Sequence, residues 1–175
     1  MGFHDANPFV FRAEIAANPY SRTAPAFGTA PASAGNMDNS IADKNILIAD
    51  DDERLLRALD KVLTSEGARV TPTKWAGDAI DVLMRHETKF DLVIADLQMP
   101  FVTGLTLLSS IHRTFPALPV IVLTAFGSPI LEAECFREGA TAFLEKPLDT
   151  AQLLGAVNAV FASSNANQQG MAICR

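Results

Sequence analysis

Acidic residues follow directly on two short apolar runs of this sequence. A run of aspartates, 50–52, comes after the apolar residues 45–49, and a lone Asp96 comes after 92–95. If both runs are buried parallel strands, their carboxyl ends place these carboxylates in one crevice, where such sheets bind ligands. Like charges so close oppose each other's ionisation, so the cluster calls for a hard cation such as Mg2+ or for a tuned acid or nucleophile. Capping of the following helix explains part of the first group, but it leaves Asp96 unexplained.

Further polar side chains stand at the ends of two later apolar runs. Thr124 follows 120–123, and Lys146, with Pro147 after it, follows 142–144. In a doubly wound sheet with the strand order 2-1-3-4-5, these ends converge with the acidic ones at the switch point. Carboxylates and a backbone carbonyl can hold Mg2+, while a hydroxyl and an ammonium take the oxygens of a phosphoryl group. The acceptor of such a transfer is expected to be Asp96, which would become an acyl phosphate.

The elements that must position these residues begin at Lys44. From there, short apolar runs alternate with longer amphipathic stretches, which is typical of βα units around a parallel sheet. Strands are expected at 45–49, 69–71, 92–95, 120–123 and 142–144, and helices at 53–66, 76–85, 105–113, 129–138 and 150–161. The predicted fold is therefore α/β, a flavodoxin-like doubly wound sheet of five parallel strands with five helices.

The first expected helix has the clearest period. Its apolar residues recur at spacings of three and four and predict one buried face, made of Leu55, Leu56, Leu59, Val62 and Leu63. Gly67 stands where a helix C-cap belongs, and Gly139 closes the fourth expected helix in the same way. The boundaries of both helices are thus predicted from capping residues as well as from periodicity.

Composition and charge limit the class of protein. The chain has 175 residues, is 49% hydrophobic and has a formal charge of -6, which fits one soluble domain with a full core. No basic run is present, so direct binding to nucleic acid is not expected, and no apolar stretch approaches the roughly 20 residues of a membrane span. Cys135 and Cys174 have no metal-type spacing, and no secretory segment precedes them. These features favour a reducing, cytoplasmic location.

Three segments are predicted along the chain. Residues 1–43 contain scattered prolines and no sustained period, so we expect a disordered extension, although its aromatic residues leave open a short docking helix at 9–17. Residues 44–162 are expected to form the folded domain. Residues 163–175 are polar and are expected to be a flexible tail.

Residues 44–162 resemble the receiver domain of two-component response regulators. The resemblance is carried by the residues 46–52, by 96–100 with Gly104, by 123–125, and by 139–147. Each piece is a weak signal by itself, whereas all of them in this order and spacing are specific. The resemblance implies that the phosphoacceptor is Asp96 and that the cofactor is Mg2+. Because an output module needs roughly 60 further residues and only a short tail follows, we expect a stand-alone, single-domain receiver.

The resemblance also implies the metal ligands. Asp51 and Asp96 would bind the ion directly, Asp50 would act mainly through a bound water, and Gln98 would offer its main-chain carbonyl.

The remaining roles that the resemblance implies concern the phosphoryl group and the switch. Thr124 and Lys146 would hold the phosphoryl oxygens, with the Lys146–Pro147 bond in cis, which is unusual even before proline. Phe143 would be the ring whose rotamer reports phosphorylation to the face made by the fourth helix and the fifth strand. Phe126 is bulky, and we expect it to restrict hydrolytic water and to lengthen the life of the phosphoryl group.

The favoured function is phosphorelay signalling. A sensor histidine kinase or a histidine phosphotransfer protein would donate the phosphoryl group, and a downstream protein partner would respond to it. A homodimer through the fourth helix, fifth strand and fifth helix is a further expectation. The chain is expected not to be an enzyme beyond its own phosphorylation and slow dephosphorylation.

Four alternatives stay open. One is a receiver fragment of a transcriptional regulator, because residues 124–127 are similar to those in receivers of such regulators. Another is a metal-dependent phosphatase with an Asp nucleophile, although Gln98 stands where those enzymes usually carry a second Asp. A flavodoxin-like cofactor binder is disfavoured, since aspartates in the first loop would repel a phosphate that arrived without a cation. A pseudo-receiver that acts only as a scaffold is disfavoured by the complete set of site residues.

Overall fold

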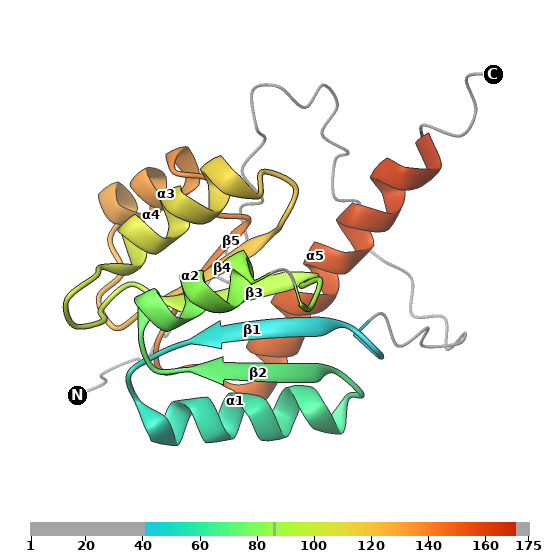
Figure 1. Ribbon diagram of the computed structural model, residues 1–175, viewed down its shortest axis with the longest axis horizontal. Helices are drawn as coiled ribbons and strands as arrows, with labels where there is room; N and C mark the ends of the chain where they lie inside the picture. The colour runs from blue at the N-terminus through green and yellow to red at the C-terminus, as the bar shows by residue number, and fades with distance from the viewer. Residues whose placement is uncertain (1–40, 86, 171–175) are drawn as a thin grey trace, which may run out of the picture.

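The computed structural model describes residues 41–85 and 87–170 (Figure 1). Five strands alternate with five helices along this part of the chain. The strands are β1 (Asn45–Ala49), β2 (Arg69–Thr73), β3 (Leu92–Asp96), β4 (Val120–Thr124) and β5 (Ala142–Glu145). The helices are α1 (Glu53–Ser65), α2 (Ala76–Met84), α3 (Gly104–Thr114), α4 (Pro129–Arg137) and α5 (Thr150–Gly170). All ten elements were expected from the sequence, and only the end of α5 departs by more than two residues.

The five strands form one parallel sheet with the order β2-β1-β3-β4-β5. Buried side chains of α2, α3 and α4 pack on one face of the sheet, and those of α1 and α5 pack on the other. Every residue of β3 and β4 is buried, which explains why these runs are apolar throughout instead of alternating with polar residues. The predicted doubly wound α/β fold and its strand order are confirmed.

Helix α1 follows the predicted pattern closely. Leu56, Leu59 and Leu63 are buried against the sheet. After the helix, Gly67 adopts a φ of 90°, donates its N–H to the carbonyl of Thr64 at 3.0 Å, and leaves the N–H of the next residue to bond the carbonyl of Leu63 at 3.1 Å. This pair of bonds is the Schellman motif, which favours glycine because of the positive φ.

Helix α5 extends further than the sequence predicted. The expected end at residue 161 is wrong, because the helix continues to Gly170 and projects past the sheet in Figure 1. The buried residues of α5 end at Phe161, which is why the apolar period stopped there. Residues 162–170 contain Ala and Gln, which favour helices, and no proline that would break one, so the helix can continue although its apolar period has ended.

The folded part also begins earlier than residue 44. Ile41 is buried among the side chains of α1 and α5, although it falls in the extension predicted for 1–43. The rest of that extension, with the docking helix considered at 9–17, lies outside the described residues. Among the described helices, none combines the length and the apolar character that a membrane crossing requires.

Candidate functional site

The polar residues predicted to converge lie along one edge of the sheet. Asp96 and Thr124 are the last residues of β3 and β4, while Asp50 follows β1 and Lys146 follows β5 directly. Since all strands run in the same direction, their carboxyl ends meet at this side, which we call the carboxyl edge. The sequence predicted that Asp96 and Thr124 come one residue after their strands end. In the structure both residues belong to the strands and pair with a neighbouring strand, so their backbones are fixed more firmly than expected.

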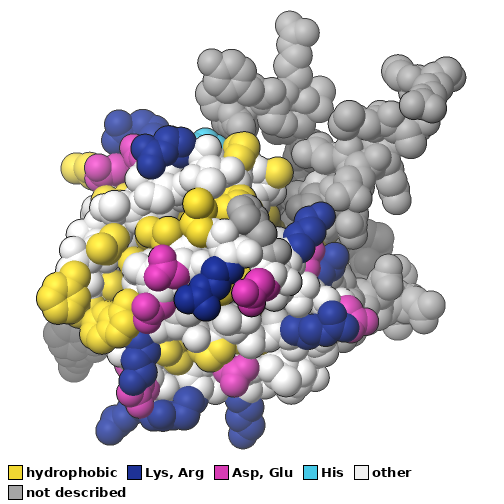
Figure 2. All heavy atoms as spheres, in the orientation of Figure 1, with side chains coloured by type: hydrophobic (Ala, Val, Ile, Leu, Met, Phe, Trp, Pro, Cys, Tyr) yellow, Lys and Arg dark blue, Asp and Glu magenta, His cyan; other side chains and the backbone are white. Residues whose placement is uncertain are grey.

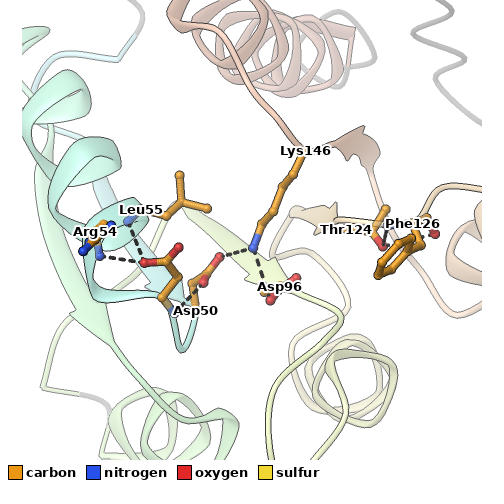
Figure 3. Close-up of polar contacts among 8 residues, drawn as sticks. Asp50, Arg54, Leu55, Asp96, Thr124, Phe126 and Lys146 are labelled. Atoms are coloured by element: carbon orange, nitrogen blue, oxygen red, sulfur yellow. Dashed lines mark hydrogen bonds and ion pairs between the residues drawn. The ribbon is translucent and has the colours of Figure 1, made fainter.

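Lys146 joins two buried carboxylates at the carboxyl edge (Figure 3). Its Nζ lies 2.7 Å from Oδ2 of Asp50 and 3.2 Å from Oδ2 of Asp96. The side chain of Asp50 is 0% exposed and that of Asp96 is 4% exposed, so water screens this trio poorly. The Lys146–Pro147 bond is cis, as the resemblance implied.

Burial and charge act on this trio in opposite directions. Burial raises the pKa of Asp50, and the hydrogen bonds from Lys146 and from the N–H of Asp52 offset part of that rise. Burial acts to lower the pKa of Lys146, but its hydrogen bond to Asp50 and the charges of Asp50 and Asp96 outweigh burial and raise it. Lys146 is therefore held as an ammonium, and one positive charge faces two carboxylates.

The three consecutive aspartates have different surroundings. Oδ1 of Asp52 accepts the N–H groups of Arg54 at 2.8 Å and Leu55 at 3.3 Å, which makes it the N-cap of α1. The N–H of Arg54 is also the main reason why the pKa of Asp52 is lowered. Asp50 accepts the N–H of Asp52 at 2.9 Å, and Asp51 is exposed. Capping thus accounts for Asp52 alone, and the other two aspartates are free for the site.

Asp50, Asp51 and Asp96 form an acidic cluster that could hold a metal ion. Each offers a carboxylate oxygen, and these oxygens lie within 4.8 Å of one another. Oδ1 of Asp96 is buried and has no hydrogen-bond partner in the described part of the chain, which is costly for a desolvated carboxylate. The donor set of the cluster is made of oxygens alone, which fits Mg2+, since that ion prefers such ligands.

Gly104 fixes the loop that leads away from Asp96. The N–H of Gly104 donates to the carbonyl of Leu97 at 3.0 Å. A Cβ added at Gly104 would stand 2.1 Å from the carbonyl oxygen of Asp96, so only glycine lets the start of α3 approach this backbone. Gln98 lies in this loop two residues after Asp96, with its side chain exposed. The glycine of the sequence motif is thus explained by close packing against the backbone of Asp96.

The hydroxyl of Thr124 bonds its own loop in this structure. Oγ1 accepts the N–H of Phe126 at 3.2 Å and lies 3.4 Å from the carbonyl oxygen of the same residue. Figure 3 shows this contact apart from the trio around Lys146. The fold therefore brings Asp50, Asp51, Asp96 and Lys146 together but leaves the hydroxyl of Thr124 turned to residue 126.

Phe143 lies on the side of the sheet that α4 covers. It pairs in register with Val122 of β4, is half-buried, and packs against the core cluster shared by α2, α3 and α4. This position is compatible with a ring that reports to α4, but the rotamer switch itself stays a prediction.

Sequence reasoning missed one contact at this edge. The carboxylate of Glu145 accepts the N–H of Gly127 at 3.2 Å, across the loop between β4 and α4. The only sign of Glu145 in the sequence was its position directly before Lys146. The pairing of Glu145 with Thr124 becomes visible only in the register of β5 against β4. Without the register, Glu145 reads as one more exposed surface carboxylate.

Exposed apolar side chains lie near the same edge. Trp75 at the start of α2 is 40% exposed, and Phe101 in the loop before α3 is 98% exposed. Their rings meet edge to face with centroids 6.0 Å apart. Figure 2 shows hydrophobic side chains gathered at the left of the view, the side toward which the arrowheads of β1 and β2 point in Figure 1. An apolar rim of this kind is typical of surfaces that contact other proteins.

Comparison with known proteins identifies the relatives of this chain. The family model described as "Response regulator receiver domain" matches residues 46–158. Transcriptional regulatory protein GlrR of Escherichia coli (strain K12) is 39% identical over 114 residues, which cover 65% of this chain and 25% of GlrR. Response regulator protein FleR of Pseudomonas aeruginosa is 37% identical over 112 residues, which cover 64% of this chain and 23% of FleR. The chain thus spans about a quarter of the length of these curated relatives.

Solved structures agree with the sequence relatives. A CheY-like receiver domain protein from Methanospirillum hungatei JF-1 superposes with a TM-score of 0.68 and 26% identity over 72% of this chain and 99% of that chain. A chain of the CheX-CheY-BeF3-Mg+2 complex from Borrelia burgdorferi superposes with a TM-score of 0.66 and 34% identity over 69% of this chain and 90% of that chain.

Proposed function

This chain belongs to the receiver-domain family of response regulators, and on that premise we propose that it serves phosphorelay signalling by accepting a phosphoryl group on Asp96. The observation that carries the proposal is the asymmetry of the Asp96 carboxylate. Lys146 holds Oδ2, while Oδ1 is buried and has no hydrogen-bond partner among the residues that the structure describes. A carboxylate held by one oxygen and free at the other is oriented for nucleophilic attack.

The transfer would proceed as a displacement at phosphorus. Oδ1 of Asp96 forms the new O–P bond as the bond from phosphorus to the donor breaks, and the bonding electrons leave with the donor group. Lys146 keeps the carboxylate in place and is near enough to take one of the phosphoryl oxygens. Thr124 takes another after its hydroxyl leaves residue 126. Mg2+ bound by Asp50, Asp51, Asp96 and the main-chain carbonyl of Gln98 would neutralise charge on the phosphoryl group.

The donor in this proposal is a phosphohistidine of a sensor histidine kinase or of a histidine phosphotransfer protein. A downstream protein partner reads the change, for which Thr124 and Phe143 are the proposed switch and α4, β5 and α5 the proposed face of a homodimer. The chain is no enzyme beyond its own phosphorylation and slow dephosphorylation, and its location is the cytoplasm. These partners and this location remain proposals, supported by the family membership.

A receiver fragment of a transcriptional regulator is the second candidate. The similarity to GlrR and FleR supports it, because this chain covers only about a quarter of each. Both candidates use the same phosphoacceptor chemistry, so the first experiment is common to them.

The experiment compares the wild type with Asp96→Asn after incubation with acetyl phosphate and Mg2+. Intact mass should show one phosphoryl group on the wild type and none on the variant, and hydroxylamine should remove it because an acyl phosphate is labile. Asp78→Asn, which changes an exposed carboxylate on α2, is the matched control and should be phosphorylated normally. An adduct that resists hydroxylamine, or that survives in Asp96→Asn, would refute the assignment.

A further inference from the structure

The loop between β4 and α4 begins at the carboxyl edge, directly after Thr124, and is held at defined points. It comprises residues 125–128. At its start the backbone of Phe126 bonds Oγ1 of Thr124, and at its end Oγ of Ser128 accepts the N–H of Leu131 at 3.1 Å as the N-cap of α4. Between these points the N–H of Gly127 donates to Oε1 of Glu145 at 3.2 Å.

The contact between Gly127 and Glu145 is close on both sides. A Cβ added at Gly127 would stand 2.8 Å from Oε2 and 2.9 Å from Cδ of Glu145. The carboxylate therefore fills the space in which a side chain at position 127 would begin. Because the nearest atoms belong to the end of a flexible side chain, alanine at this position would displace the carboxylate without a large rearrangement of the backbone.

Glu145 acts from a fixed position. It pairs in register with Thr124 at the end of the β4–β5 ladder, and the N–H of Lys146 donates to the carbonyl of Thr124 at 2.7 Å. Lys146 is in turn tied to the two buried carboxylates of the trio. The backbone at 145–146 is thus anchored, so a change that breaks the contact must come from the Glu145 side chain or from the loop.

Movement of this loop matters for the proposed phosphoryl transfer. Thr124 can take a phosphoryl oxygen only when its hydroxyl leaves the N–H and carbonyl of Phe126. Both of these groups belong to the loop, and Gly127 is the next residue. A bond that holds Gly127 therefore also holds Phe126 beside Thr124 and favours the arrangement in which the hydroxyl is engaged.

We propose that Glu145 is a positioning residue that holds the β4–α4 loop through the N–H of Gly127 and thereby opposes recruitment of Thr124 to the phosphorylated acceptor. The inference rests on the proposed function, since it assigns Thr124 to the phosphoryl group. Loss of the contact shifts the equilibrium of the loop toward the recruited state. An exposed, charge-assisted hydrogen bond should shift it about two- to five-fold, which equals about 0.4–1 kcal/mol.

Three variants separate the contact from the charge. Glu145→Ala removes both the acceptor and the negative charge, and Glu145→Gln removes the charge but keeps an oxygen that can accept the N–H. Gly127→Ala keeps the charge but displaces the carboxylate. Glu138→Ala is the control, because it removes an exposed carboxylate at the far end of α4 from the loop.

The readouts are the affinity for beryllofluoride with Mg2+, followed by NMR, the initial rate of phosphorylation by acetyl phosphate, and thermal stability. We expect Glu145→Ala and Gly127→Ala to raise affinity and rate about two- to five-fold, and Glu145→Gln and the control to change them less. If affinity and rate rise equally in Glu145→Ala and Glu145→Gln but do not rise in Gly127→Ala, the effect is due to the charge of Glu145, and the proposal is overturned. If Glu145→Ala and Gly127→Ala lower the thermal stability but raise neither affinity nor rate, the contact has a merely structural role, and the proposal is overturned as well.

The wild-type chain itself separates the role of Glu145 from the proposed function. If the wild-type chain takes up neither a phosphoryl group nor beryllofluoride, the proposed function is refuted. The role of Glu145 is then refuted with it, because there is no phosphoryl group to which Thr124 could be recruited. If the wild type takes up both and all three variants match it, the function stands and the role of Glu145 is refuted alone.

Discussion

Replacement of Lys146 by Met should destabilise the protein substantially in the absence of Mg2+. Met keeps most of the aliphatic length of the side chain and removes the ammonium that lies 2.7 Å from Asp50 and 3.2 Å from Asp96. Both carboxylates are almost fully buried, so the variant leaves them close together without their cation. Breaking a buried ion pair from one side typically costs about 3–5 kcal/mol.

The cost at this site should be smaller than that range. The side chain of Lys146 is 19% exposed, so water reaches part of the trio and can solvate the carboxylates once the ammonium is gone. We therefore expect a loss of about 2–3 kcal/mol in the free energy of unfolding. Mg2+ should recover part of the loss, because the folded variant has one positive charge fewer at the cluster and should bind the cation more tightly than the wild type does. A cation that binds only the folded state adds stability by mass action, and tighter binding adds more.

The assay is urea unfolding at 25 °C, with EDTA in one series and with Mg2+ in the other. Lys74→Met is the matched control, since Lys74 pairs with Glu53 and both side chains are about half exposed, and such pairs contribute about 0–1 kcal/mol. A Lys146→Met variant no less stable than the Lys74→Met control would refute the reasoning that the trio is a poorly screened, mutually dependent set of charges. If Mg2+ stabilised neither the wild type nor the variant, the fit of the acidic cluster to the ion would be refuted.

Three further changes test other parts of the structure. Gly104→Ala should destabilise the protein and slow phosphorylation by acetyl phosphate, because its Cβ would meet the backbone oxygen of Asp96 at 2.1 Å; a variant with wild-type melting temperature and rate would contradict this packing. Phe126→Ala should speed loss of the phosphoryl group, measured by intact mass over time, since we propose that this ring restricts water; an unchanged dephosphorylation rate would dispose of that role. In a Cys174→Ser background, Cys135 should react slowly with iodoacetamide while folded, because burial raises the pKa of its thiol to about 11. Its rate should keep rising above the ordinary thiol pKa of about 8.5, and a plateau there would argue against this burial.

The sequence determined the framework on which the site is built. The apolar runs predict the strands because a buried parallel strand needs apolar residues on both faces, and the strand order places their ends together. Capping residues such as Gly67 are equally local, since a positive φ at the end of a helix favours glycine wherever the helix lies. Asp50, Asp96 and Lys146 could therefore be assigned to one edge before any distance was known.

The tertiary structure decided which of these groups meet. That Asp52 caps α1 while Asp50 bonds Lys146 depends on the direction in which the chain leaves β1, which three identical residues in a row do not encode. The contact of Glu145 with Gly127 depends on the register of β5 against β4. Periodicity reports only how much of each residue is buried, whereas a hydrogen bond depends on where two distant segments bring their atoms. The sequence alone therefore placed the functional groups on one edge, and only packing of the helices and strands selected their partners.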